Sequence, residues 1–269
     1  MSFISYAQNL EDVILWRIFK HIQNGVYIDV GANDPVMNSV TKAFYDHGWR
    51  GINIEPMQQY YQRLRQERAE DVTLPLAAGA EEGVFVYYEI PDTGLSTLNS
   101  AIAEHHQKNG WTVVRRTVQV MPLSFICRQY VKDSIHFLKV DVEGTEKQVL
   151  LGMDFQHYRP WIILVETIPP LSQGQNYTDW EYILLDSGYQ YVYFDGLNRF
   201  YISHEKVEEI KPYFSSPPNV FDDYLRYSEY CLLCEKNRLV QENQELVQQK
   251  ERLQEELSFT PTNLGRITS

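Results

Sequence analysis

The fold is decided by the stretch Val26-Tyr27-Ile28-Asp29-Val30-Gly31-Ala32-Asn33-Asp34, where an apolar run ends in an acid and a turn of small residues. A second apolar run, Gly51-Ile52-Asn53-Ile54, is closed by the lone acid Glu55. A doubly wound parallel sheet builds a nucleoside site from such parts: the first turn lets a ligand approach the backbone, and the second acid accepts hydrogen bonds from ribose hydroxyls. Taken alone, the first stretch is equally typical of a buried strand followed by an ordinary turn.

The first turn also indicates which nucleoside fits. Gly31 is its only glycine of the G-x-G-x-x-G pattern, and Pro35 stands where a tight pyrophosphate turn favours glycine. A nucleoside without phosphates therefore fits better than a dinucleotide, and S-adenosylmethionine (SAM) is the obvious candidate. A nicotinamide-dependent oxidoreductase is a competing class that the missing glycines disfavour.

The composition limits the classes of molecule that the protein can bind. The 269 residues are 43% apolar, enough for a sizeable core, and the net charge of −12 argues against nucleic acid or an anionic membrane surface as the main partner. No stretch resembles a signal peptide or a transmembrane segment, and three cysteines suit a reduced, cytoplasmic protein. Cys231-x-x-Cys234 lacks the second ligand pair of a zinc site, which favours two incidental helix residues.

Strand and helix patterns alternate along the chain and end in a hairpin around Asp195-Gly196-Leu197-Asn198. This order predicts an α/β sandwich with a mixed, mostly parallel sheet. The predicted strands are 27–30, 51–54, 72–77, 84–90, 135–141, 161–166, 189–194 and 199–203. The predicted helices are 5–19, 39–47, 58–67, 101–108, 145–151 and 180–187. Residues 92–98 have the chemistry of a loop, and the rest of 91–117 outside the helix at 101–108 shows no pattern that assigns it.

Four of the predicted strands end in acids: Asp29, Glu55, Asp141 and Glu166. In open α/β sheets the ligand crevice lies outside the carboxyl ends of the strands. We therefore expect all four carboxylates to face one crevice.

The C-terminal part of the chain has a different pattern. Leu232, Leu239, Leu246 and Leu253 recur at a seven-residue interval in a segment rich in Glu, Gln, Lys and Arg. This spacing is typical of a coiled coil, whose a-type positions would be mostly polar: Lys236, Asn243, Lys250 and Leu257. Self-association or docking to a partner is favoured over the alternative, a solvated helical linker.

The sequence resembles the FkbM family of SAM-dependent methyltransferases, chiefly through the motif Phe137-Leu138-Lys139-Val140-Asp141-Val142-Glu143-Gly144-Thr145-Glu146. The resemblance covers roughly residues 5–223. It also rests on Ser5-Tyr6-Ala7-Gln8-Asn9-Leu10-Glu11-Asp12, Trp49-Arg50-Gly51-Ile52-Asn53-Ile54-Glu55-Pro56, Leu95-Ser96-Thr97-Leu98, Arg159-Pro160-Trp161 and Phe194-Asp195-Gly196-Leu197-Asn198-Arg199-Phe200. Each motif alone is moderately specific, whereas their order and spacing together are highly specific.

The resemblance implies a Rossmann-like class I methyltransferase fold and an enzyme that methylates an oxygen, often a sugar hydroxyl in a glycan or natural product. It covers the methyltransferase domain that we place at 1–228. The coiled coil or helical linker at 229–258 and the flexible tail at 259–269 lie outside the resemblance and are predicted from the sequence pattern. The turn from Asp29 to Asn33 would hold the methionine part of SAM, Glu55 the ribose, and residues 77–79 the adenine. The implied cofactor-binding residues are Asp29, Gly31, Ala32, Asn33, Glu55, Pro56 and Ala78.

Methyl transfer to a sugar hydroxyl needs a base or a metal, because such a hydroxyl is a poor acid. Asp141 is our first choice for the base, with Glu143 just beyond it and Glu166 converging from the next strand. Three carboxylates suit a hard divalent cation such as Mg²⁺. The alternative is that Glu143 caps a helix and Glu166 pairs with an arginine. Lys139 would neutralise Asp141.

Three further residues are candidates for binding the acceptor. Asp195 and Asn198 lie in the hairpin turn, where their alternative role is turn formation. His204 follows the last strand and, like His105 and His106, is otherwise expected to be a surface or packing residue.

The sequence thus predicts a cytoplasmic SAM-dependent O-methyltransferase that acts on a carbohydrate. The tail would join copies of the chain or hold the domain beside a glycosyltransferase. The alternative is a non-catalytic methyltransferase-fold module assembled through the tail.

Overall fold

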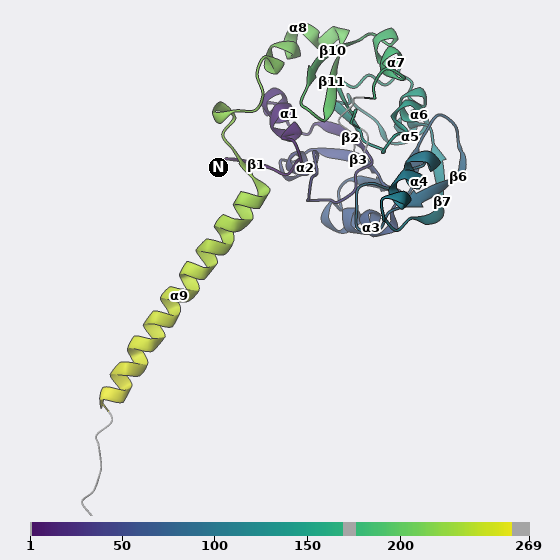
Figure 1. Ribbon diagram of the computed structural model, residues 1–269. Coiled ribbons are helices and arrows are strands. Elements are labelled where there is room, and N and C mark those ends of the chain that lie inside the picture. The colour runs from purple at the N-terminus through teal and green to yellow at the C-terminus, as the bar shows by residue number, and fades with distance from the viewer. Residues whose placement is uncertain (1, 169–175, 260–269) are drawn as a thin grey trace, which may run out of the picture. The chain divides into compact units, whose positions relative to one another are not determined.

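The computed structural model describes residues 2–168 and 176–259, which form two compact units, Met1–Tyr224 and Leu225–Ser269. The first unit is built around a seven-stranded sheet with the order β10-β11-β9-β8-β2-β3-β4 (Figure 1). Its strands are β2 (Val26–Val30), β3 (Arg50–Ile54), β4 (Val72–Leu74), β8 (Phe137–Val140), β9 (Ile162–Glu166), β10 (Tyr189–Phe194) and β11 (Asn198–Ser203).

The sheet is mixed, as predicted. β4, β3, β2, β8 and β9 run parallel, and β11 pairs antiparallel with both β9 and β10. The strands that follow β2 in the sequence lie first on one side of it (β3, β4) and then on the other (β8, β9). The chain therefore leaves β2 in one direction and returns to its opposite side for β8. This is the topological switch point at which open α/β sheets bind ligands.

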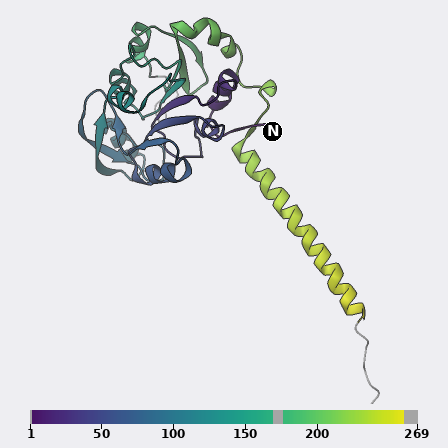
Figure 2. The same ribbon diagram turned by 180° about the vertical axis from the view of Figure 1, so that it is seen from behind.

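Helices cover both faces of the sheet, which makes a three-layer sandwich (Figures 1 and 2). Ile28, Val30 and Leu138 pack on the face covered by α5 (Leu123–Tyr130), α6 (Glu146–Leu151) and α7 (Glu181–Asp186). Tyr27 and Phe137 pack on the opposite face, toward α1 (Glu11–Phe19), α2 (Lys42–Asp46) and α8 (Val207–Ile210). Adjacent residues alternate between faces because successive strand side chains point in opposite directions.

The remaining elements lie around this core. A smaller sheet has the order β5-β7-β6, formed by β5 (Ala77–Ala78), β7 (Val114–Met121) and β6 (Gly83–Glu89). The other described elements are β1 (Phe3–Ser5), α3 (Gln58–Glu67), α4 (Ser100–Lys108), η1 (His204–Lys206), η2 (Lys211–Phe214), η3 (Val220–Asp222) and β12 (Tyr224–Arg226).

The helix predicted for residues 5–19 begins only at Glu11. Before it, the Asp12 carboxylate accepts hydrogen bonds from the Ser5 hydroxyl at 2.7 Å and from the Tyr6 and Ala7 amides at 2.7 and 3.2 Å. These bonds fold the chain into a turn, and Leu10 takes a left-handed conformation with φ 66°. The apolar spacing was correct, but a local polar interaction competes with the helix.

The strand predicted for 72–77 is in fact two strands in two sheets. β4 ends at Leu74, Pro75 follows, and Ala77 pairs with Val120 in the smaller sheet. Proline has no amide hydrogen to continue a ladder. β7 and α5 were not predicted; the outer residues of β7 are polar, and its main partner is the edge strand β6.

The second unit contains α9 (Tyr227–Phe259), a continuous helix of 33 residues. The helical part of the prediction for residues 229–258 is therefore confirmed. Residues 260–269, most of the predicted flexible tail, lie outside the described residues. Among the residues that are described, no helix is long and apolar enough to cross a membrane.

Candidate active site

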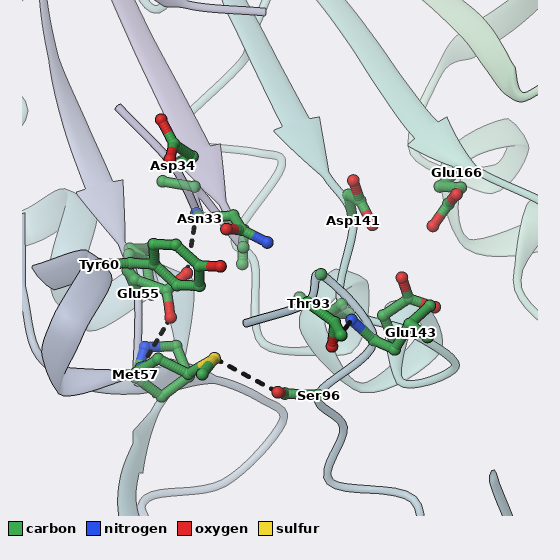
Figure 3. Close-up of a pocket in the computed structure, with 18 of the residues that line it drawn as sticks. Asn33, Asp34, Glu55, Met57, Tyr60, Thr93, Ser96, Asp141, Glu143 and Glu166 are labelled. Atoms are coloured by element: carbon green, nitrogen blue, oxygen red, sulfur yellow. Dashed lines mark hydrogen bonds between the residues drawn. The ribbon is translucent and has the colours of Figure 1, made fainter. Parts of the chain in front are cut away.

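A cavity of about 540 Å³ opens beyond the carboxyl ends of β2, β3, β8 and β9 (Figure 3). Its walls come from the turn after β2, the start of α3, the loop before α4 and the loop after β8. Of the predicted site residues, it is lined by Gly31, Ala32, Asn33, Glu55, Pro56, Ala78, Asp141, Glu143 and Glu166.

The turn after β2 is packed directly against the strand end of β8. The Gly31 and Ala32 amides donate to the Ile54 carbonyl at 3.0 and 3.2 Å. A side-chain carbon at Gly31 would collide with the carbonyl oxygen of Asp141, and its φ of +78° also favours glycine. This single glycine therefore allows two walls of the cavity to meet.

Glu55 fixes the floor of the cavity. Its carboxylate accepts hydrogen bonds from the Asn33 amide at 2.8 Å and the Met57 amide at 2.7 Å (Figure 3). Burial raises the pKa of Glu55 to about 7, against the opposing effect of these two donors. Each carboxylate oxygen keeps a second lone pair, so Glu55 can still accept hydrogen bonds from a diol.

The same end of the cavity has walls that the sequence did not reveal. Met57, Tyr60, Tyr87 and Ser96 join Ala78 there, and the Ser96 hydroxyl donates to the Met57 sulfur at 3.3 Å. These side chains come from three different elements, so no local pattern links them. Apolar and aromatic groups beside a buried acid suit a flat base with a ribose.

At the other end, Asp141, Glu143 and Glu166 offer carboxylate oxygens that all lie within 4.8 Å of one another. Burial and the negative charge of Asp141 raise the pKa of Glu143 to about 9 and that of Glu166 to about 12. Desolvation would also raise the pKa of Asp141, but the Lys139 ammonium outweighs it and lowers that pKa. At neutral pH the cluster thus carries one carboxylate anion and two protonated acids.

Lys139 is the cation that sets this pattern. Its ammonium lies 3.1 Å from Asp141 Oδ2, 3.5 Å from Asp29 Oδ1 and 3.4 Å from the Gly31 carbonyl oxygen. Desolvation disfavours its charge, yet the two aspartates raise its pKa above the ordinary value. The predicted neutralisation of Asp141 by Lys139 is therefore confirmed.

The loop that carries Glu143 is held in an unusual conformation. Glu143 has φ 55° and Gly144 has φ 96°. The Thr97 hydroxyl donates to the Glu143 carbonyl at 2.7 Å, and Glu146 accepts from the Gly144 amide at 2.9 Å. It is thus Glu146, rather than Glu143, whose carboxylate binds amides at the start of α6.

Asp29, by contrast, does not face the crevice. It is the fourth residue of β2, opposite Lys139 on β8, and is only 1% exposed. Its Oδ2 accepts from the Thr41 hydroxyl at 2.8 Å. The expectation that four strand-end acids share one crevice is therefore wrong for Asp29, because Val30 still belongs to the strand and the alternation turns Asp29 toward α2.

The three predicted acceptor-binding residues also lie outside the cavity lining. Asp195 accepts from the Leu197 and Asn198 amides at 2.7 and 2.6 Å, and Asn198 donates to Glu11 at 2.9 Å. His204 is exposed at the start of η1. The hairpin instead contributes Leu197 to the cavity, so the turn-forming alternative for Asp195 is correct.

A divalent cation could be held by Asp141, Glu143 and Glu166, whose oxygens match what Mg²⁺ prefers. Two of these carboxyls hold protons at neutral pH, so a bound cation would have to displace them.

A mixed sheet with one reversed strand, and a cavity beyond its switch point, are the arrangement expected of a Rossmann-like methyltransferase. The family model described as the methyltransferase FkbM domain matches residues 29–191, more than half of the chain. The chain therefore belongs to the FkbM family of SAM-dependent methyltransferases, which confirms the resemblance seen in the sequence.

The solved structures to which this chain is similar are distant from it in sequence. The FkbM methyltransferase from Methylobacillus flagellatus KT is 14% identical, with a TM-score of 0.42 and coverage of 70% of this chain and 47% of that one. The O-methyltransferase from Bacillus cereus, solved with SAH, is 8% identical over 74% and 81%, with a TM-score of 0.40. The TehB-like SAM-dependent methyltransferase from Corynebacterium glutamicum is 7% identical over 71% and 87%, with a TM-score of 0.39.

This chain thus spans about half the length of the FkbM structure. No protein of curated function matches the sequence.

Proposed function

We propose that the protein transfers the methyl group of SAM to a hydroxyl of a carbohydrate. The observation that carries this proposal is the division of one cavity into two ends. One end offers a backbone turn, a buried acid and apolar walls, and the other offers three convergent carboxyls beside a lysine.

The cofactor would occupy the first end. The turn from Gly31 to Asn33 would take its methionine part, Glu55 its ribose hydroxyls, and Ala77 and Ala78 its adenine. Asp29 would act from behind this turn, through Lys139 and Thr41, rather than by touching the ligand.

The chemistry needs a base near the transferred methyl group. SAM supplies an electrophilic methyl on a sulfonium; the acceptor oxygen forms the new C–O bond, the C–S electrons pass to sulfur, and the hydroxyl proton goes to a carboxylate. The arrangement favours Glu143, in its ionised form, over Asp141 for that proton, because Lys139 makes Asp141 the weaker base. Asp141 and Glu166 would then orient the acceptor or hold Mg²⁺.

The lining of the cavity supports a polyhydroxylated acceptor. Gln8, Asn38 and Thr145 offer amide and hydroxyl groups that can bind several hydroxyls. Six acidic side chains line the cavity with one ammonium, and Glu143 and Glu166 among them are protonated at neutral pH: Asp34, Glu55, Asp92, Asp141, Glu143 and Glu166, with Lys139. A neutral or basic sugar therefore fits better than a uronate or a sugar phosphate.

The test is calorimetric titration of the protein with S-adenosylhomocysteine, with and without Mg²⁺ and with NAD as the control ligand. We expect micromolar binding of S-adenosylhomocysteine and none of NAD. Glu55→Ala should weaken that binding by about 1–3 kcal/mol, as expected when a buried charged hydrogen bond is lost.

Glu67→Ala, at the exposed end of α3, is the matched control and should bind normally. Wild-type affinity in Glu55→Ala would refute the ribose assignment. Absence of any binding by the wild-type protein would favour the non-catalytic module instead.

A further inference from the structure

The helix α9 exposes a row of apolar side chains between Leu232 and Leu253. Their exposed fractions range from 48% to 71%, although such side chains are normally buried in a stable helix. They are Leu232, Leu233, Leu239, Val240, Leu246, Val247 and Leu253. An exposed row of this kind marks an interaction surface.

We propose that this surface binds a second copy of the same helix in a parallel, two-stranded coiled coil. The row repeats every seven residues over more than three heptads, so a copy of the helix presents a row of matching length and spacing. The leucines Leu232, Leu239, Leu246 and Leu253 occupy the d positions, and Leu233, Val240 and Val247 the neighbouring e positions.

The a and d positions of the two helices would form the seam of the coiled coil. The polar residues at its a positions favour a dimer of two parallel helices. Asn243 lies at an a position, where a buried asparagine bonds its own copy in a parallel dimer and fixes the register. In an antiparallel pair Asn243 would instead meet a leucine and lose that partner. Lys236 and Lys250, at two further a positions, can direct their ammonium groups to the edge of the seam.

The charged residues beside the seam also favour a parallel pair of helices. Glutamates occupy three g positions, at Glu235, Glu242 and Glu256, and Arg238 pairs with the first two along its own helix. An antiparallel pair brings g rows face to face and sets glutamate against glutamate. In a parallel pair these glutamates face the apolar e row, and Glu235 of the second copy lies beside Lys236.

The test is the mass of the full-length chain in solution, measured by sedimentation velocity. We expect twice the mass of one chain at micromolar concentration. Leu246→Glu should halve that mass, because it places charge in the seam, whereas Gln248→Glu adds the same charge on the outer face and should leave the dimer intact.

Single cysteines report the orientation. Cys231 and Cys234 are exposed and are first replaced by serine. Leu239→Cys and Leu253→Cys, each made alone in that background, should both form disulfide-linked dimers on mild oxidation. A wild-type chain that stays monomeric, a dimer that survives Leu246→Glu, or cross-linking at neither position would overturn the proposal. The melting temperature of the first unit, Met1–Tyr224, should be the same in all of these variants as in the wild type.

Discussion

Glu143 shows how one residue combines strain with an altered pKa. Its left-handed backbone is held by Thr97 on one side and Glu146 on the other, and its carboxyl has a pKa of about 9. A non-glycine residue with positive φ stores energy, and such positions often occur at functional sites. The loop therefore presents a strong base at a fixed place in the cavity.

We predict that Glu143→Gln lowers the turnover number at least 100-fold while leaving the affinity for S-adenosylhomocysteine within a few-fold. Because the base acts only when deprotonated, wild-type turnover should rise with pH toward about 9. Radiolabelled methyl transfer to an oligosaccharide panel, followed from pH 6 to 10, measures both effects. An unchanged profile in the variant would assign the base to Asp141 or Glu166.

Arg68 holds the segment that follows the cofactor turn. It is fully buried and donates to the Pro35 carbonyl at 2.6 and 3.2 Å, to the Ser39 hydroxyl and, at 2.6 Å, to the Thr41 hydroxyl. Thr41 in turn donates to Asp29. Pro35, which departs from the usual glycine of the motif, is thus anchored through its carbonyl.

We predict that Arg68→Met lowers the free energy of unfolding by about 3 kcal/mol, since several buried acceptors lose their donor. Affinity for S-adenosylhomocysteine should fall as well, because the turn loses its support. Urea unfolding and calorimetry measure the two losses. Arg65→Met, on the exposed side of α3, is the control, and equal losses in both variants would contradict the role of Arg68.

At the scale of the element, the start of α1 contains two adjacent buried acids. Burial raises the pKa of Glu11 to about 7, helped by the charge of Asp195, and burial raises the pKa of Asp12 to about 6. Glu11 accepts from the Asn9 amide and from Asn198, so this helix end is tied to the hairpin. The tie is made through groups that titrate near neutral pH.

We predict that stability falls as pH rises through this range. The unfolded Glu11 carboxyl titrates near 4.5 and the folded one near 7, so the folded chain keeps a proton that the unfolded chain loses. Urea unfolding at pH 5 and pH 8 should show a smaller loss for Glu11→Gln than for the wild type. The exposed Glu67→Gln should retain the wild-type loss. An identical loss in Glu11→Gln would contradict the shifted pKa.

Elements with a strong local pattern could be predicted from the sequence, and so could the acids that follow buried strands. Glu55, Asp141 and Glu166 meet in the cavity because strand ends share one edge of the sheet. Arg68, Glu146 and Thr97 could not be found in this way, since each acts by binding backbone or hydroxyl groups distant in sequence. The failure at Asn198 has a similar origin, because its partner Glu11 lies 187 residues away.

At the scale of the whole molecule, the net charge of −12 is reflected in the acidic cavity. SAM carries one more positive charge than S-adenosylhomocysteine, so SAM should bind more tightly by about 1 kcal/mol, roughly fivefold in Kd. Calorimetry at 50 and 500 mM NaCl should show this ratio shrinking as salt screens the field. A ratio of one at both salt concentrations would contradict an electrostatic contribution of the cavity to the binding of SAM.

The contact between Gly31 and the Asp141 carbonyl has a consequence for how this enzyme could be retargeted. Methyl donor and methyl acceptor would be held by two segments that touch through a glycine, leaving no space to adjust one against the other. New acceptors would therefore have to be accommodated by other lining residues, such as Gln8, Met37 and Leu197, which lie in connecting loops. Variation there would change what is methylated while the distance over which the methyl moves stays constant.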